Sequence, residues 1–125
     1  MKNYKDLNVW RKAHELVLLI YKLTKKFPRE EQFNLISQMR RAGTSIPTNI
    51  AEGCGKYTQR DFANYLQTAQ GSSQEIEYLS FLSYELGYLK EDDYRVLDIN
   101  VNEVKAMLIS LIKKVRRDES IRLKS

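Results

Sequence analysis

Apolar residues recur at alternating spacings of three and four along most of the chain, which is the period of an amphipathic α-helix. The pattern divides into four helical segments, at about residues 6–26, 30–55, 58–87 and 91–115, with Pro28 between the first two. The stripe of the last segment is unbroken and consists of Tyr94, Leu97, Val101, Val104, Leu108, Leu111 and Val115. Because short connections make neighbouring helices antiparallel, we predict an all-α, up-down-up-down antiparallel four-helix bundle.

The second helical segment contains Pro47, which has no N–H to donate and whose ring crowds the carbonyl of Gly43. Its apolar stripe nevertheless keeps the helical phase on both sides of the proline, through Ile36, Met39, Gly43, Ile46, Ile50 and Gly53. A loop at this point would have changed the phase. We therefore expect helix two to be one helix, kinked at Pro47.

A single four-helix-bundle domain is expected over residues 1–115, because a chain of 125 residues suits one domain that hides roughly two-thirds of its unfolded surface. Residues 116–125 lack a core pattern and are predicted to form a frayed basic C-terminal tail. Several helices carry more apolar surface than one bundle needs. The aromatic residues of the third segment either contact another subunit or flank the core; they are Tyr65, Tyr78, Phe81, Tyr84 and Tyr88.

The formal net charge of +5 is concentrated in the first half of the chain. Residues 1–60 contain 12 Lys+Arg and 5 Asp+Glu, whereas residues 61–125 contain 9 and 11. A positive half is typical of proteins that bind polyanions such as RNA or DNA. A surplus of surface charge that favours solubility explains the same counts, so charge alone leaves both interpretations open.

Cys54 is the only cysteine, which excludes an internal disulfide and is typical of a reducing compartment. The N-terminal residues form no apolar signal core, and the apolar run at residues 16–21 is far shorter than the roughly 18 residues that indicate a membrane span. We therefore expect a soluble, cytoplasmic protein that makes no membrane contact.

No set of residues in the chain has the pattern of a catalytic or metal site. His14 is the only histidine, which excludes multi-histidine zinc sites, histidine relays and the paired Glu-x-x-His motifs of di-metal bundles. The sequence Gly-Cys-Gly-Lys at residues 53–56 lacks the spacing and the preceding strand of a phosphate-binding loop. We expect a protein that is not an enzyme, with no catalytic residues, no metal and no cofactor.

A polar stripe follows helix two beside its apolar stripe. Its members are Gln38, Arg41, Ser45, Thr48, Asn49 and Glu52. Spacings of three and four place such residues on one side of a helix, where they can form a hydrogen-bonded network. We interpret this stripe as a structural polar seam that fixes the register of helices or subunits, in preference to an active site.

Basic and aromatic residues suggest a surface for nucleic acid. The candidates are Arg11, Lys12, Arg40, Lys56, Tyr57 and Arg60. Basic side chains beside an aromatic ring and a helix N-terminus can hold phosphates and stack a base. Scattered solvated charge is the alternative interpretation for each of these residues taken singly.

The sequence of residues 38–53, QMRRAGTSIPTNIAEG, resembles the signature of the four-helix-bundle family known as the 23S ribosomal RNA intervening-sequence proteins. Further similar motifs occur in the same order, namely Leu7, Val9, Trp10 and Ala13, then Phe27, Pro28 and Glu30, and later Phe62, Leu66, Ala69, Gly71, Ser72 and Glu75. The resemblance covers roughly residues 4–115. Gly43 stands where alanine is more usual, and Gln70 stands where a basic or apolar residue is expected.

The resemblance implies an antiparallel bundle that assembles into a ring-like homopentamer. The family's members are encoded within inserts of bacterial ribosomal RNA genes or stand alone. A related branch, the accessory variability determinants of diversity-generating retroelements, forms a basic barrel that binds nucleic acid and a reverse transcriptase. This chain is more similar to the stand-alone branch, for which the family supplies no established activity.

Two functions follow as hypotheses from these observations. The first is a non-enzymatic oligomeric protein that binds nucleic acid, RNA or DNA, through a basic surface. The alternative is a protein–protein scaffold or adaptor with no nucleic-acid role, which the surplus apolar flanks of the helices favour.

Overall fold

The computed structural model describes residues 3–124 and contains four α-helices and no strand within that range. The helices are α1 (Asn8–Thr24), α2 (Leu35–Cys54), α3 (Gln59–Glu85) and α4 (Glu91–Lys124). Two short 3-10 helices, η1 (Tyr4–Asp6) and η2 (Arg29–Glu31), precede α1 and α2. The expected all-α four-helix bundle is confirmed. Residues 1, 2 and 125, which the predicted domain and tail include, lie outside the described residues.

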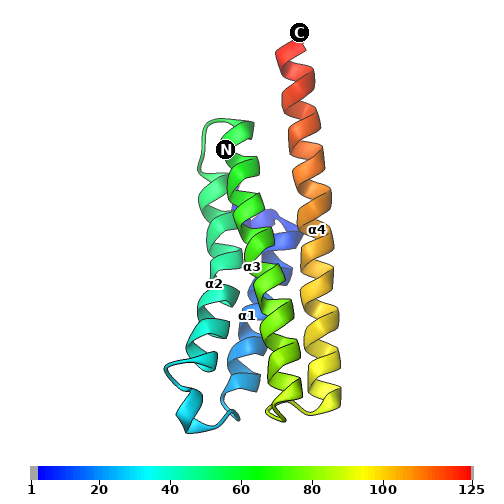
Figure 1. The fold of residues 1–125 in the computed structure, drawn as a ribbon. Coiled ribbons are helices and arrows are strands. Elements are labelled where there is room, and N and C mark those ends of the chain that lie inside the picture. Colours follow the sequence, from blue (N-terminus) through cyan, green and yellow to red (C-terminus); the bar gives the residue numbers. More distant parts are fainter. Residues whose placement is uncertain (1–2, 125) are drawn as a thin grey trace.

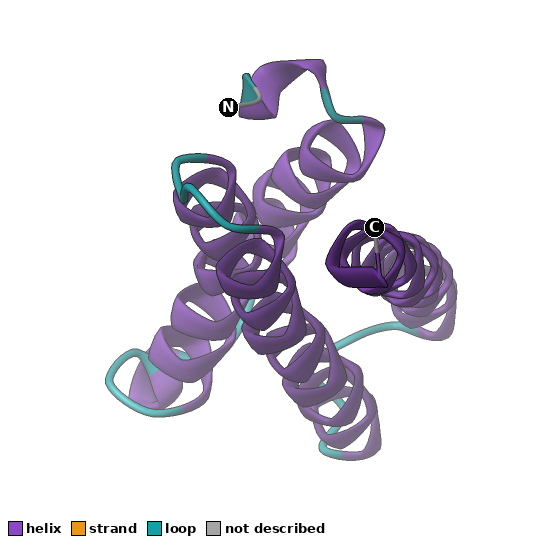
Figure 2. Cartoon of the chain, turned by 90° about the horizontal axis from the view of Figure 1, so that it is seen from above, coloured by secondary structure: helices purple, strands orange, loops and turns teal. Residues whose placement is uncertain are grey.

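Successive helices run in opposite directions along the bundle (Figure 1). Each helix packs on two neighbours, α1 on α2 and α4, and α3 likewise on α2 and α4. Figure 2 shows this ring of four helices along the bundle, with the end of α4 pointing toward the viewer. Of the helices in residues 3–124, none is long and apolar enough to cross a membrane.

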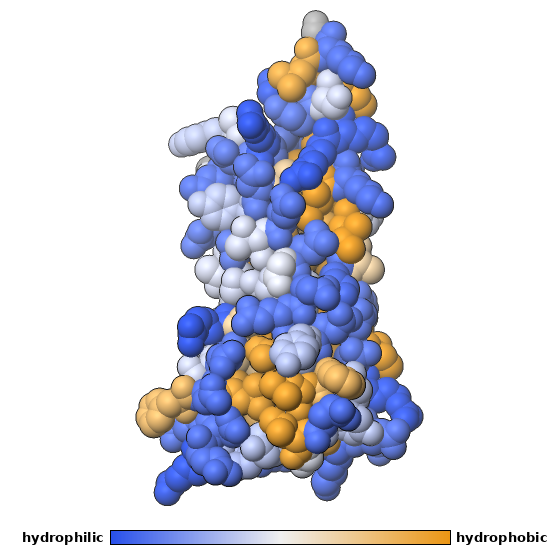
Figure 3. Space-filling view, viewed as in Figure 1, coloured by the Kyte–Doolittle hydropathy of each residue, from blue (hydrophilic) through white to orange (hydrophobic). Residues whose placement is uncertain are grey.

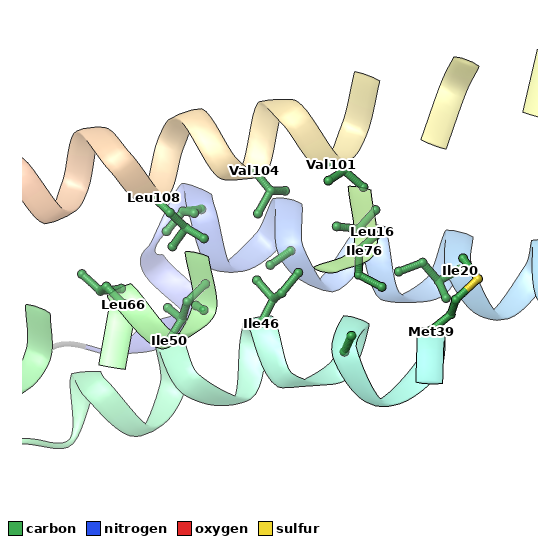
Figure 4. Packing of buried hydrophobic residues seen from close by; sticks show 14 of the residues in the cluster. Leu16, Ile20, Met39, Ile46, Ile50, Leu66, Ile76, Val101, Val104 and Leu108 are labelled. Atoms are coloured by element: carbon green, nitrogen blue, oxygen red, sulfur yellow. The ribbon is translucent and has the colours of Figure 1, made fainter. Parts of the chain in front are cut away.

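The surface and the interior of the bundle differ in the way that the apolar stripes predict. The surface is mostly hydrophilic, with a hydrophobic patch over the lower half of α3 (Figure 3). Inside, large apolar side chains from all four helices converge (Figure 4). The fully buried ones include Leu16, Ile20, Met39, Ile46, Ile50, Leu66, Ile76, Leu97, Val101, Val104 and Leu108. Each such side chain contributes roughly 1.5–3 kcal/mol by leaving water.

Small polar side chains on α3 allow α2 to approach it closely. Ser80 and Ser83 are fully buried, and each hydroxyl donates to the carbonyl four residues earlier at 2.7 Å. The hydroxyl of Ser83 also lies 3.5 Å from the sulfur of Met39 on α2. Because these hydroxyls bond within their own helix, they carry no cost of unpaired burial.

Helix α2 starts later than the sequence indicates but continues through Pro47. The expected start near Glu30 is instead the 3-10 turn η2, and the backbone at Asn34 is non-helical, with φ −127° and ψ −98°. The segment after Pro28 therefore makes a separate turn before α2 begins. The expectation of one helix across Pro47 agrees with the structure, whereas the kink stays a prediction.

Helix α3 has the ends that the sequence predicts. The side chain of Thr58 accepts a hydrogen bond from the backbone N–H of Asp61 at 3.1 Å, as an N-cap does. After the helix, Gly87 has a φ of +82°, and the N–H of Tyr88 donates to the carbonyl of Ser83 at 2.9 Å. A glycine in this left-handed conformation lets the chain turn directly into α4.

Helix α4 is longer than expected. It continues to Lys124, beyond the ends of the other helices (Figure 1), so residues 116–124 are helical, whereas the fraying of this segment stays a prediction. The segment contains no glycine or proline after Val115 that would stop a helix. An ion pair three residues apart, between Arg122 and Glu119 at 3.2 Å, supports its last turns.

Candidate nucleic-acid interface

Three of the candidate residues lie together where α2 passes into α3. Tyr57 is 95% exposed, and Lys56 and Arg60 on either side of it are exposed too. The ammonium group of Lys56 lies 5.0 Å from the ring centroid of Tyr65, a cation–π contact that limits its freedom. The first turn of α3, with its outward N–H groups, begins at the same place.

Helix α4 brings a further arginine to this point. Arg60 and Arg116 line one pocket of about 210 Å³, together with Gln59, Ala63, Asn64 and Glu119. The guanidinium of Arg116 also donates to the side-chain oxygen of Gln67 on α3 at 2.8 Å. One arginine from each of two helices therefore lines the same small pocket, which Glu119 also lines, and the exposed Tyr57 precedes Arg60 by three residues in the chain.

Lys113 and Arg117 are further exposed basic residues on the same part of α4 as Arg116, and the sequence interpretation did not include them in the nucleic-acid surface. We define the basic end as Lys56, Arg60, Lys113, Arg116 and Arg117, all of which are exposed, whereas Lys114 lines a separate pocket with Leu7 and Asn8 on the α1 side. A finer division of the charge would have found them. Residues 61–103 contain 2 Lys+Arg and 9 Asp+Glu, whereas residues 104–125 contain 7 and 2. The net charge of the second half as a whole therefore conceals a basic segment at its end.

The other three candidates lie apart from the basic end. Arg40 is half-buried in the lower half of α2, where its guanidinium lies 4.5 Å from the ring centroid of Tyr21 and its Nε donates to Thr24 Oγ1 at 3.0 Å. These contacts pack α2 against α1 and place Arg40 away from the basic end, so its part in a nucleic-acid surface stays a prediction.

Arg11 and Lys12 are exposed on α1 but are engaged locally. Arg11 Nη1 donates to the carbonyl of Lys5 at 2.9 Å, and its other terminal nitrogen donates to the Asn8 side chain. Lys12 pairs with Glu103 of α4 at 3.4 Å. They stand on the α1 side of the molecule and do not share the pocket of Arg60.

The polar stripe of α2 lies largely at the surface, and among the described residues 3–124 its middle is the part that bonds to another helix. Ser72 of α3 donates to Ser45 Oγ at 2.9 Å, and the Asn49 amide donates to the same oxygen at 2.9 Å. Gln38, Arg41 and Ser45 line a pocket of about 500 Å³ on the α3 side, shared with Phe33, Ala42, Ser72 and Glu75. Thr48 and Glu52 line a different pocket on the α1 side.

The single histidine and cysteine are not brought together. Cys54 is buried, while the imidazole of His14 stacks on the indole of Trp10 with a centroid distance of 5.2 Å. Within residues 3–124, no group of three or more His, Cys, Asp or Glu side chains is placed to hold a metal ion.

Comparison with known proteins agrees with this fold. The family described as 23S rRNA-intervening sequence protein matches residues 5–110. The chain belongs to this family. Among solved structures, the chain is similar to a protein of unknown function from the S23 ribosomal protein family of Bacteroides thetaiotaomicron VPI-5482. The two are 32% identical with a TM-score of 0.79, over 84% of this chain and 98% of the other. No curated protein matches the chain.

For a 23S rRNA-intervening sequence protein, the matched range separates two parts of the surface. The match ends at residue 110, so Arg116 and its basic neighbours on α4 lie beyond it. Lys56, Tyr57 and Arg60 lie within it. The basic end is therefore formed partly by the matched bundle and partly by the extension of α4.

Proposed function

We propose that this 23S rRNA-intervening sequence protein is a non-enzymatic protein that binds single-stranded RNA or DNA through its basic end. The observation that carries the proposal is that Arg60 and Arg116 line one pocket and that the exposed Tyr57 lies three residues before Arg60. Guanidinium groups bind phosphate oxygens in a forked geometry, and an exposed aromatic ring offers a face on which a base can stack. Phosphate contacts and a stacking ring together suit a single strand.

The distribution of charge supports the same end of the molecule. Every residue of the basic end is exposed, and no ion pair within residues 3–124 engages any of them. At the opposite end, Arg95 is paired with Glu91 at 3.3 Å in the acidic first turns of α4. An unpaired basic cluster retains more of its attraction for phosphate than one that acidic neighbours neutralise.

Binding of a fluorescent single-stranded RNA and of the matching DNA, followed by anisotropy at several salt concentrations, tests this proposal. For single strands, the logarithm of the affinity falls with the logarithm of salt by about 0.7 for each phosphate contact. Replacing both arginines (Arg60→Gln with Arg116→Gln) is expected to weaken binding and to reduce that slope by about 1.4. The matched control removes two exposed arginines at the other end, Arg29→Gln with Arg95→Gln, and should bind as wild type does.

The outcomes separate clearly. Equal binding by the two double variants would refute the basic end as the site. Absence of binding by the wild-type protein to RNA and DNA at low salt would refute the function itself. In that case the scaffold hypothesis would be the better account of the exposed apolar surface.

Self-assembly is a second proposal, which rests on a different surface. Tyr78, Phe81 and Leu86 at the C-terminal end of α3 are exposed, and Figure 3 shows the hydrophobic patch in this region. Monomeric proteins rarely expose large apolar patches, so we infer that copies of this chain cover it, as the homopentamer implied by the family resemblance would do.

Light scattering tests the assembly directly. A homopentamer has five times the mass of the 14.7 kDa chain. Phe81→Glu should shift the mass toward the monomer, whereas Leu123→Glu, an equally apolar exposed position on the α4 extension, should leave it unchanged. A monomeric wild-type protein would contradict the proposal.

A further inference from the structure

A second pocket near the basic end combines aromatic rings with an acceptor. It has a volume of about 390 Å³ and lies between α1 and α2. The lining residues are Tyr4, Trp10, His14, Val17, Thr44, Pro47, Thr48, Ala51 and Glu52. A concave site of this size with a few polar groups is typical of small-ligand binding.

The α1 side of the pocket is aromatic. The rings of Trp10 and His14 are nearly parallel, with an interplanar angle of 4° and a centroid distance of 5.2 Å. Tyr4 meets Trp10 edge to face at 4.9 Å. Trp10 and His14 face each other, so a flat ligand stacks on an outer face of the pair, and rings that hold one another in place lose little entropy when it does.

The α2 side provides hydroxyl groups and one carboxylate. Thr44 already donates to the carbonyl of Arg40 at 2.9 Å. Glu52 is exposed, and its side chain forms no ion pair or hydrogen bond with another residue of the described range 3–124. An ionised carboxylate only accepts hydrogen bonds, so a ligand that suits this pocket must present N–H donors beside its flat face.

Among the nucleobases, guanine meets this requirement best. Its Watson–Crick edge presents two adjacent N–H donors, which match the two oxygens of a carboxylate. Adenine and cytosine present an amino group beside a ring nitrogen that would repel the carboxylate, and uracil presents one N–H between two carbonyls. Proteins recognise unpaired bases by such edge contacts together with stacking on aromatic rings.

We propose that this pocket binds an unpaired guanine, which stacks on the Trp10–His14 pair and donates two N–H groups to Glu52. The inference rests on the proposed function for the strand that carries the base. The pocket lies between α1 and α2, whereas the pocket of Arg60 and Arg116 lies between α3 and α4, so a strand held at the basic end must cross the end of the bundle to reach it. The pocket would then give a base preference to a surface that otherwise reads only phosphates.

The intrinsic fluorescence of the protein tests the pocket without a strand, because Trp10 is the only tryptophan. Guanosine is expected to quench this fluorescence with saturation. Inosine, which lacks the exocyclic amine, should bind about tenfold more weakly, since one hydrogen bond to a charged group is lost. Guanosine and its monophosphate should behave alike if the base, and not a phosphate, carries the affinity.

Substitution of the carboxylate supplies the control. Glu52→Gln keeps the shape of the side chain but replaces its two acceptor oxygens with one acceptor and one donor. The ratio of the affinities for guanosine and inosine should fall by about tenfold in this variant. Glu15→Gln removes the same charge from an exposed position on α1 outside the pocket and should leave the preference unchanged. Equal helical content of both variants by circular dichroism would show that folding is not the cause.

A second experiment, with RNA strands in place of the nucleoside, distinguishes this inference from the proposed function. An oligouridine with a single guanosine should bind more tightly than oligouridine alone, and Glu52→Gln should remove the difference. If RNA binds but guanosine neither quenches Trp10 nor improves strand binding, the guanine pocket is wrong while the proposed function stands. If guanosine binds as expected but no strand does, the pocket stands and the proposed function fails.

Discussion

Three glycine-to-alanine substitutions test how closely the helices approach one another. Gly43 and Gly53 lie in α2, and Gly71 lies in α3. Alanine has a higher helix propensity than glycine, and in a helix interior this difference stabilises the folded protein by about 1 kcal/mol. What differs among the three positions is the space available to the new methyl group.

The structure gives that space for each position. A Cβ at Gly71 has no neighbouring atom within 4 Å. At Gly43 it would lie 2.8 Å from Ile20 Cδ1, the end of a side chain that can rotate away. At Gly53 it would lie 2.9 Å from Tyr65 Cβ and 3.4 Å from the Phe62 carbonyl oxygen, atoms fixed to the backbone of α3.

These contacts decide whether each substitution raises or lowers the free energy of unfolding. Gly71→Ala should raise the free energy of unfolding by about 1 kcal/mol. Gly43→Ala should change it by less than about 0.5 kcal/mol, because the strain of moving the isoleucine offsets the gain in propensity. Gly53→Ala should lower it by about 1–2 kcal/mol, since overpacking costs about 1–3 kcal/mol and the gain is small at a helix end.

Urea denaturation followed by circular dichroism measures all three free energies. The variants must be compared at one protein concentration, because self-association would shift the midpoints. A Gly53→Ala variant as stable as Gly71→Ala would show that α2 and α3 are not packed as closely as the structure places them.

Two further predictions concern polar contacts. Lys105 binds Glu77 of α3 at 3.0 Å, and both side chains are largely covered. Lys105→Ala should lower the free energy of unfolding by about 1 kcal/mol in the same urea titrations. Arg95→Ala, which removes an exposed ion pair, should lower it by less than about 0.5 kcal/mol. The hydroxyl of Tyr88 donates to Glu31 at 3.0 Å, which raises the pKa of Tyr88. Because the pKa of Tyr88 is raised, the neutral tyrosine stabilises the folded state below pH 10, and this contribution is lost as the pH rises further. The free energy of unfolding should therefore fall less steeply above pH 10 in Tyr88→Phe than in the wild-type protein, as measured by denaturation across alkaline pH. An identical alkaline decline in both proteins would exclude this hydrogen bond as a source.

The sequence predicted the elements of the bundle because periodicity and capping are local signals. The third segment was predicted to span residues 58–87, and the structure has an N-cap at Thr58 and a glycine with positive φ at position 87. The start of α2 was placed too early because the acidic residues after Pro28 also suit a 3-10 turn, as η2 shows. The end of α4 was placed too early because the loss of an apolar stripe removes packing and not helix propensity.

The candidate site was only partly predictable, because its residues meet through tertiary packing. Lys56, Tyr57 and Arg60 are neighbours in sequence and were found together. Arg116 reaches Arg60 only because α4 packs beside the start of α3, and no local pattern reports that contact. The contact of Arg40 with the ring of Tyr21 is likewise tertiary, and no local pattern in the sequence reports it.

Two exposed aromatic residues at opposite ends of the bundle allow the most direct test of the basic end as the binding site. Tyr57 is 95% exposed at the basic end, and Phe33 is 91% exposed beside η2 at the other. Ultraviolet cross-linking of the wild-type protein to single-stranded RNA, followed by trypsin and mass spectrometry, reports on both, in the peptides of residues 57–60 and 30–40. Binding at the basic end predicts RNA adducts on the peptide that contains Tyr57 and none on the peptide that contains Phe33. Adducts confined to the Phe33 peptide would contradict it.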